Sequence, residues 1–313
     1  AGVTLMADSR VQNLARLPDT LRRMLLRVAD PFEAEDIVRY SEYSLQSGTE
    51  AISALGAAAR KLKKTHQVIL MIDLGDLREG IPYSDEARIL ETAGEAVREE
   101  GLELAGVGTN LTCFGGILPD ERNLGLLIGI AEKIRKAFRI PLPIVSGGNS
   151  SSLHLLFEGR LPAEINQLRI GESLLLGTDT SCGKPFPQLS QRVFTLSARL
   201  VEVQDKPSKP EGSTGPNAFG EQVFFPDLGL MQRGILAIGR QDTDPQSLLP
   251  ADQDVRLLGA SSDHLIADLT HAKPYRVGDA LDFVPGYGAL LKAYTSPYVR
   301  KTYINIGENE RHD

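Results

Sequence analysis

Short apolar runs alternate with longer amphipathic stretches from the start of the chain to about residue 188. This alternation is typical of βα units around a parallel sheet. Polar or glycine-rich residues follow each apolar run, as expected where a strand opens into a loop. The predicted strands are Val3–Met6, Met24–Val28, Tyr43–Leu45, Val68–Ile72, Leu104–Gly108, Pro143–Val145 and Gln167–Ile170.

Two stretches between these strands carry clear helical signals. Thr49–Lys64 has apolar residues at spacings of three and four, which predicts a helix with one buried face. Ser84–Glu100 predicts a second helix, in which Ser84 is the expected cap and Asp85 and Glu86 place negative charge in the first turn.

Seven βα units are one fewer than a closed parallel barrel normally contains. The first predicted strand starts at residue 3, and seven strands would leave an open edge of backbone donors and acceptors. We therefore expect a (β/α)8 TIM-type barrel over residues 1–188 whose first βα unit is missing, because an N-terminal segment is absent.

The pattern changes after Gly183–Pro187 to an alternation rich in β-branched residues, which predicts a C-terminal all-β domain over residues 189–313. Lys206–Gly220 is rich in Pro, Gly and Ser and is expected to form a surface loop. The predicted strands are Phe194–Val203, Gly234–Ile238, His264–Leu269 and Ala280–Val284.

The composition of the chain favours small molecules as its binding partners. With 313 residues, 42% hydrophobic content and a net charge of -7, the chain has a core but no basic field for nucleic acid or anionic membrane. No apolar run reaches the roughly 20 residues of a membrane span, and no leader peptide is evident. The cysteines, Cys113 and Cys182, allow at most one disulfide, so a cytoplasmic location is expected.

Four strand ends carry residues suited to an anion, and strand ends are where barrels of this type place their chemistry. Arg78 lies in a glycine-bounded loop, Asn110 follows the next strand, and Arg169 ends the last one. The segment Ser146–Ser152 (SGGNSSS) offers backbone N–H groups and hydroxyls of the kind that bind phosphate. The alternatives are a plain polar loop and structural salt bridges for the two arginines.

Other reactive residue types give weaker signals. Asp73 and Asp76 have no neighbouring His to complete a ligand set, so no metal site is predicted. Cys113 lacks an evident His partner, which favours an inert thiol. His264 follows hydroxyls and a carboxylate, and it is either an acid/base group or a buried strand histidine.

Taken in order, these motifs resemble the fold-type III pyridoxal phosphate (PLP) racemases, most closely the ornithine racemase branch of the alanine racemase superfamily. The resemblance covers almost the whole chain. The strings that carry it are MIDLGDLREG, GTNLTCFGG, SGGNSSSL, INQLRIGE, AIGRQD and LGASSDHLIADLT.

The resemblance implies a set of cofactor-binding residues. Arg78 matches the residue that holds the phenolic oxygen of pyridoxal 5'-phosphate, and Asn110 matches one near the pyridine face. Arg169 resembles the arginine bound to the pyridine nitrogen, which keeps this nitrogen unprotonated and favours racemisation. The residues matched to the phosphate site are Asn149, Ser150, Gly171 and Glu172.

Racemisation needs one base on each face of Cα. Alanine racemases use a Schiff-base lysine and a tyrosine of the partner's β domain, and here Arg240 occupies the tyrosine position. Asp263 and His264 match a substrate-facing segment and are the candidate replacements. This arrangement implies a head-to-tail homodimer, and Asp242 and Asp263 suit a substrate with a distal ammonium, such as ornithine or lysine.

The family's Schiff-base lysine lies at the end of the first barrel strand, and none of the chain's eleven lysines is in a comparable place. The chain as written is therefore expected not to attach the cofactor covalently. The alternatives to a racemase are a non-catalytic PLP-binding protein, an inactive truncated form, and a remnant that binds phosphate weakly.

Overall fold

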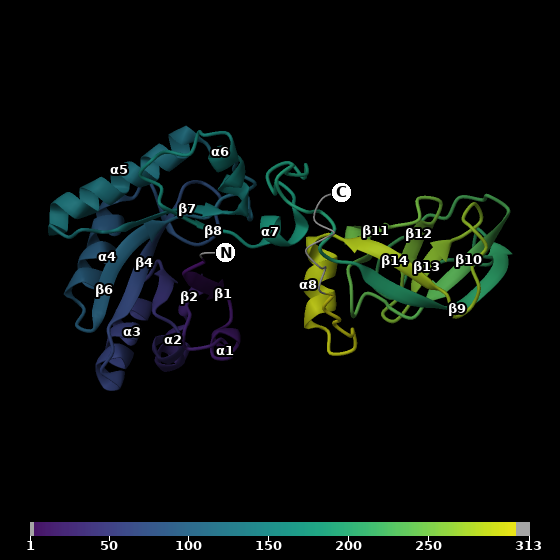
Figure 1. Cartoon of the computed structure of the whole chain (residues 1–313), viewed down its shortest axis with the longest axis horizontal. Coiled ribbons are helices and arrows are strands. Elements are labelled where there is room, and N and C mark those ends of the chain that lie inside the picture. The colour runs from purple at the N-terminus through teal and green to yellow at the C-terminus, as the bar shows by residue number, and fades with distance from the viewer. Residues whose placement is uncertain (1–2, 305–313) are drawn as a thin grey trace. The chain divides into compact units, whose positions relative to one another are not determined.

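The computed structural model describes residues 3–304, and the chain divides into two compact units, Ala1–Leu189 and Ser190–Asp313. Figure 1 shows the elements of each unit. The first unit is an α/β structure and the second is built mainly of antiparallel strands. No helix within residues 3–304 combines the length and the apolar character that a membrane crossing requires.

The first unit contains a parallel sheet in the order β1-β2-β3-β4-β6-β7-β8, with the short β5 paired to β4 (Figure 1). All seven predicted strands are present, which confirms a parallel, barrel-like sheet. The strands are β1 (Leu5–Asp8), β2 (Arg22–Val28), β3 (Tyr43–Gln46), β4 (His66–Asp73), β5 (Ile81–Pro82), β6 (Leu102–Gly108), β7 (Ile144–Asn149) and β8 (Gln167–Arg169).

Helices connect these strands, and their ends follow from local sequence. The Asp85 side chain accepts from Arg88 N at 3.1 Å and so caps α4, which makes the expected cap at Ser84 wrong. The helices are α1 (Val11–Leu14), α2 (Ala34–Tyr40), α3 (Thr49–Leu62), α4 (Glu86–Arg98), α5 (Glu121–Phe138), α6 (Leu153–Phe157) and α7 (Glu172–Leu176), with 3-10 turns at Pro31–Glu33 and Ser150–Ser152.

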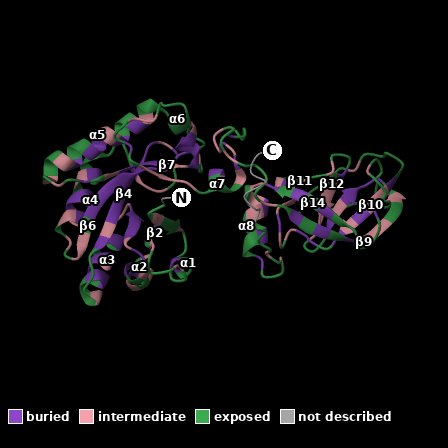
Figure 2. Cartoon of the chain, in the orientation of Figure 1, coloured by how far each residue is buried: buried purple, intermediate pink, exposed green. Residues whose placement is uncertain are grey.

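The central strand β4 is buried on both faces, as strands of a covered parallel sheet are (Figure 2). Val68 and Leu70 pack in the cluster formed with α4 and α5, whereas Ile69 and Met71 pack in a second cluster with Leu45. Because successive side chains point to opposite faces, one apolar run supplies both cores.

The second unit has an antiparallel sheet in the order β11-β14-β9-β10-β13-β12. The alternation in sequence predicted four of these strands, and the structure adds the short β11 and β12. It also adds the helix α8, which the sequence analysis did not predict. The elements are β9 (Leu196–Pro207), β10 (Leu230–Leu236), β11 (Leu248–Pro250), β12 (Arg256–Ala260), β13 (Leu265–Asp268), β14 (Ala280–Pro285) and α8 (Tyr287–Thr295), with a 3-10 turn at Pro245–Ser247.

Candidate functional site

The predicted cofactor residues of the first unit lie at the carboxyl ends of four neighbouring strands, β4, β6, β7 and β8. Parallel strands end at a common edge, so residues far apart in sequence meet there. Asn149 is paired in register with Arg169, and hydrogen bonds join Arg78, Asn110 and Arg169 through one further residue, Glu79.

Arg169 is held by neutral oxygens. Its guanidinium donates to Thr109 O and Asn110 Oδ1, both at 2.6 Å, and to Ser146 Oγ. Burial lowers the pKa of Arg169 to about 10, so the group remains charged at neutral pH. Among the described residues no carboxylate contacts it directly, which leaves a partly buried positive charge at the sheet edge.

Glu79 connects the other two members of this group, and the sequence analysis did not single it out. Arg78 donates to both Glu79 oxygens, at 2.6 Å to Oε1, and Asn110 Nδ2 donates to the same Oε1. The hydrogen bond with Glu79 raises the pKa of Arg78. The only sequence signal was an acidic residue directly after the arginine.

The loop predicted to bind phosphate begins inside a strand. Asn149 ends β7 and donates to Leu111 O at 3.0 Å and to Cys113 Sγ at 3.1 Å. Ser150 Oγ accepts from the backbone N–H groups of Gly171 and Ser173, both at 3.2 Å. Two main-chain donors therefore converge on one oxygen.

Glu172 starts the short helix α7 beside this point and is half-buried. Burial raises the pKa of its carboxyl, which lowers the tendency of Glu172 to carry negative charge there.

Asp73 and Asp76 organise loops. Asp73 Oδ1 accepts from the backbone N–H groups of Gly75 and Leu77, at 2.8 and 3.2 Å. The buried Asp76 carboxylate accepts three backbone N–H groups of the loop after β6. Within residues 3–304 no three His, Cys, Asp or Glu side chains gather as a metal-ligand group.

The three predicted acid/base residues lie in the second unit. Arg240 forms two hydrogen bonds with Glu221, at 2.9 and 2.7 Å, and its guanidinium lies 4.3 Å from the Phe219 ring centre. Asp263 and His264 are exposed in the turn between β12 and β13. Ser262 Oγ donates to the Asp263 carboxylate at 2.6 Å. Among the described residues, the Asp263 and His264 side chains form no hydrogen bond with a buried residue.

The edge residues fit two parts of pyridoxal phosphate. The donors converging at Ser150 suit a phosphate oxygen, and the Arg169 guanidinium, bound only to neutral acceptors, suits the lone pair of a pyridine nitrogen. No lysine within residues 3–304 directly follows a strand of the parallel sheet. In the first unit they lie near the end of α3, on α5 and in a connector, at Lys61, Lys63, Lys64, Lys133, Lys136 and Lys184.

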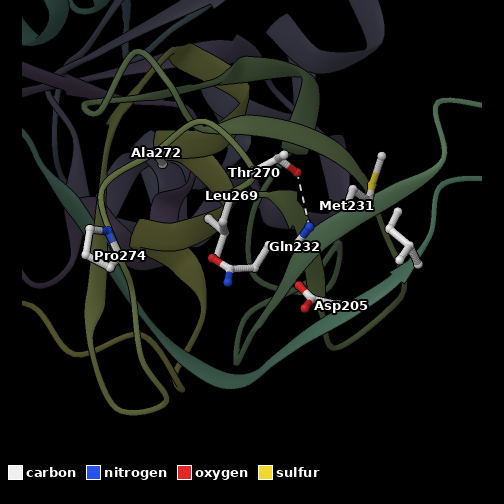
Figure 3. A pocket seen from close by; sticks show the side chains of 8 residues that line it. Asp205, Met231, Gln232, Leu269, Thr270, Ala272 and Pro274 are labelled. Atoms are coloured by element: carbon white, nitrogen blue, oxygen red, sulfur yellow. Dashed lines mark hydrogen bonds between the residues drawn. The ribbon is translucent and has the colours of Figure 1, made fainter.

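A separate hollow of about 450 Å³ lies on the second unit, between β10 and the segment after β13 (Figure 3). Thr270 Oγ1 accepts there from Gln232 N at 3.1 Å, and the rest of the lining includes Leu269 and Pro274. The hollow contains none of the predicted site residues. Its lining supplies one carboxylate, from Asp205, and no cation.

Comparisons with known proteins identify the family to which the chain belongs. Residues 1–179 match the family described as "Alanine racemase, N-terminal domain". The chain is 47% identical over 304 residues to an ornithine racemase of Acetoanaerobium sticklandii, covering 96% of this chain and 86% of that protein. It is 38% identical over 307 residues to a lysine racemase of Thermotoga maritima, covering 97% and 85%.

Solved structures show the same fold at lower identity. An alanine racemase from Bartonella henselae with covalently bound pyridoxal phosphate matches with a TM-score of 0.64 at 17% identity, over 94% of this chain and 79% of that one. An alanine racemase from Streptomyces lavendulae matches with a TM-score of 0.66 at 18% identity, over 99% and 86%. The chain belongs to the alanine racemase family of pyridoxal-phosphate-dependent amino-acid racemases.

Proposed function

We propose that this protein racemises a basic amino acid, with ornithine as the first candidate and lysine as the second. The relatives at 47% and 38% identity, an ornithine racemase and a lysine racemase, support this substrate class. The observation that carries the reaction type is Arg169, a charged guanidinium held only by neutral acceptors at the sheet edge.

The cofactor roles in this proposal come from the family resemblance. Arg78 would hold the phenolic oxygen of pyridoxal phosphate, Asn110 would lie near its ring, and Arg169 would bind its nitrogen. Asn149, Ser150, Gly171 and Glu172 would hold its phosphate. When bound, the cofactor supplies the electron sink that makes the Cα proton acidic.

The second acid/base is Asp263 or His264 in this proposal. Arg240 is a poor proton carrier, because its hydrogen bond with Glu221 raises its pKa further. Asp263 and His264 are exposed, so both can exchange protons with a substrate at an interface. We also propose a head-to-tail homodimer, in which the second unit of one copy completes the site of the other.

Asp242 and Asp263 are the proposed partners of the distal ammonium of the substrate. Asp242 Oδ1 accepts from Ser296 Oγ at 2.6 Å, which fixes that carboxylate. A cytoplasmic location is part of the proposal, since Cys113 and Cys182 are both free thiols.

The test is racemisation of L-ornithine, L-lysine and L-alanine in D₂O with added pyridoxal phosphate. It compares this chain with an extended form, to which an N-terminal strand that ends in lysine has been added. We expect the extended form to invert ornithine fastest and to place deuterium at Cα. Binding of the cofactor without deuterium exchange would instead support the alternative, a non-catalytic PLP-binding protein.

Two variants of the extended form, Asp263→Asn and His264→Gln, identify the second acid/base. Loss of that group stops inversion while Cα exchange of one enantiomer continues, because the base on the other face is intact. Asp205→Asn is the matched control, since Asp205 is exposed in the same unit. If both variants invert ornithine as fast as the control does, neither residue is the second base.

A further inference from the structure

The Glu79 carboxylate lies between two of the proposed cofactor residues. Both of its oxygens accept from the Arg78 guanidinium, and Oε1 also accepts from Asn110 Nδ2. The Glu79 side chain is 18% exposed, against 43% for that of Arg78. The carboxylate is therefore shielded from water enough for its hydrogen bonds to set the geometry.

The backbone holds Glu79 in this place through the next residue. Gly80 has φ +130°, and a Cβ there would lie 2.5 Å from Asp73 N. The chain after β4 therefore packs back against the end of the strand, and the following β5 pairs with Ile72–Asp73. Glu79 precedes this close approach, so its position does not depend on a free loop.

The contact with Glu79 also fixes which way the Asn110 amide faces. Its nitrogen must point to the carboxylate, because only the nitrogen can donate, and its oxygen is then left to accept from Arg169 at 2.6 Å. We propose that Glu79 is a positioning residue, which holds Arg78 directly and Arg169 through the Asn110 amide, and so sets the two guanidinium groups of the cofactor site.

Cys113 supplies a reporter for this charge arrangement that needs no cofactor. Burial raises the pKa of the Cys113 thiol, Arg78 opposes the rise, and Asp76 and Glu79 add to it. Loss of the Glu79 charge frees Arg78 to stabilise the thiolate. The thiol then reacts at lower pH.

The first readout is the pH dependence of Cys113 alkylation by iodoacetamide, measured in a Cys182→Ser background so that one thiol reports. Glu79→Gln is expected to move the midpoint to lower pH, and Glu79→Asp to leave it near that of the parent because the charge remains. Glu86→Gln is the matched control, since Glu86 is paired with Lys133 on the outer helices. The control should not move the midpoint.

The second readout rests on the proposed function and uses racemisation by the lysine-bearing form. Both Glu79→Gln and Glu79→Asp should lower kcat/KM by roughly 10- to 100-fold, the usual effect of removing a residue that orients a site. The aspartate is too short to reach Arg78 and Asn110 together, so retention of charge alone does not rescue turnover.

The outcomes separate the two ideas. An unmoved thiol midpoint in Glu79→Gln, or parental turnover in Glu79→Asp, would overturn the role of Glu79. A parent form that binds no cofactor and racemises nothing would overturn the proposed function, and the alkylation profile would still decide whether Glu79 controls the charge at this edge.

Discussion

Asp76→Asn is expected to loosen the loop after β6 without unfolding the first unit. The Asp76 carboxylate is 1% exposed and accepts the N–H groups of Cys113, Phe114 and Ile117 at 3.0, 2.9 and 3.2 Å. Its backbone oxygen also accepts from Gly115 N at 2.9 Å. Asp76 thus accepts four backbone N–H groups of this loop, three of them through its side chain.

The size of the effect follows from those bonds. A hydrogen bond to a charged group contributes about 1.5–3 kcal/mol net. Asparagine keeps one acceptor oxygen, so its best orientation retains the bonds to Cys113 and Phe114 in weaker, neutral form. Its NH₂ group then faces Ile117 N–H, and that bond is lost. The expected loss is about 3 kcal/mol of local stability, or roughly 100-fold in the opening equilibrium.

Hydrogen exchange of residues 112–118 measures this opening directly. The matched control is Asp120→Asn, because Asp120 caps α5 and asparagine caps a helix about as well as aspartate. Protection should fall roughly 100-fold in Asp76→Asn and change little in the control. If protection in the two variants falls equally while both remain folded by circular dichroism, the carboxylate does not hold the loop.

Three further predictions concern other parts of the chain. Gly80→Ala should lower the free energy of unfolding of the first unit by roughly 2–5 kcal/mol in urea, because of backbone strain and a clash at Asp73. Gly75→Ala, where the added Cβ meets open space, should lower it less. Equal losses in the two variants would show that the clash is not the cause. Burial lowers the pKa of His66 from 6.5 to about 4. The roughly 3 kcal/mol of folding stability linked to this shift is therefore present above pH 6.5 and lost as pH falls toward 4. If the stability of His66→Gln falls equally steeply with acid, this linkage is refuted. Arg240→Lys should speed proteolysis within residues 208–229, because it releases Glu221 and the Phe219 ring from the guanidinium. An unchanged cleavage rate would show that these contacts do not order the loop.

The strands β3, β4 and β6 of the first unit were predictable because they are buried on both faces along most of their length and so leave short apolar runs. The position at which β7 ends was not predictable. Ser146–Ser152 read as a loop, yet the strand continues to Asn149, because a Cβ at Gly147 would lie 2.4 Å from Ile165 Cγ2 and only glycine permits that packing. Glycine here serves strand packing, a role that sequence alone does not separate from loop formation.

The candidate site was predictable to the extent that strand ends define it. Arg78 and Asn110 follow the buried strands β4 and β6, Arg169 ends β8, and parallel strands bring their ends to one edge. Glu79 was missed because its role depends on the return of the chain at Gly80, which no pattern of apolar residues encodes. The loop contacts of the second unit were missed for the same reason. Glu221 pairs with Arg240 across 19 residues, and the spacing of the two residues does not predict the pair.

The charged side chains at the sheet edge differ in how their charges are balanced. Arg78 is compensated by Glu79, and the Asp76 carboxylate is already occupied by three backbone donors. Arg169 is left with neutral partners, and burial raises the pKa of the Glu172 carboxyl. Among the described residues of this edge, Arg169 is therefore the guanidinium without a direct carboxylate partner, and the pyridine nitrogen of the proposed cofactor would be a further neutral acceptor for it. Burying this positive charge is costly, and the hydrogen bonds to Thr109 O, Asn110 Oδ1 and Ser146 Oγ offset part of that cost.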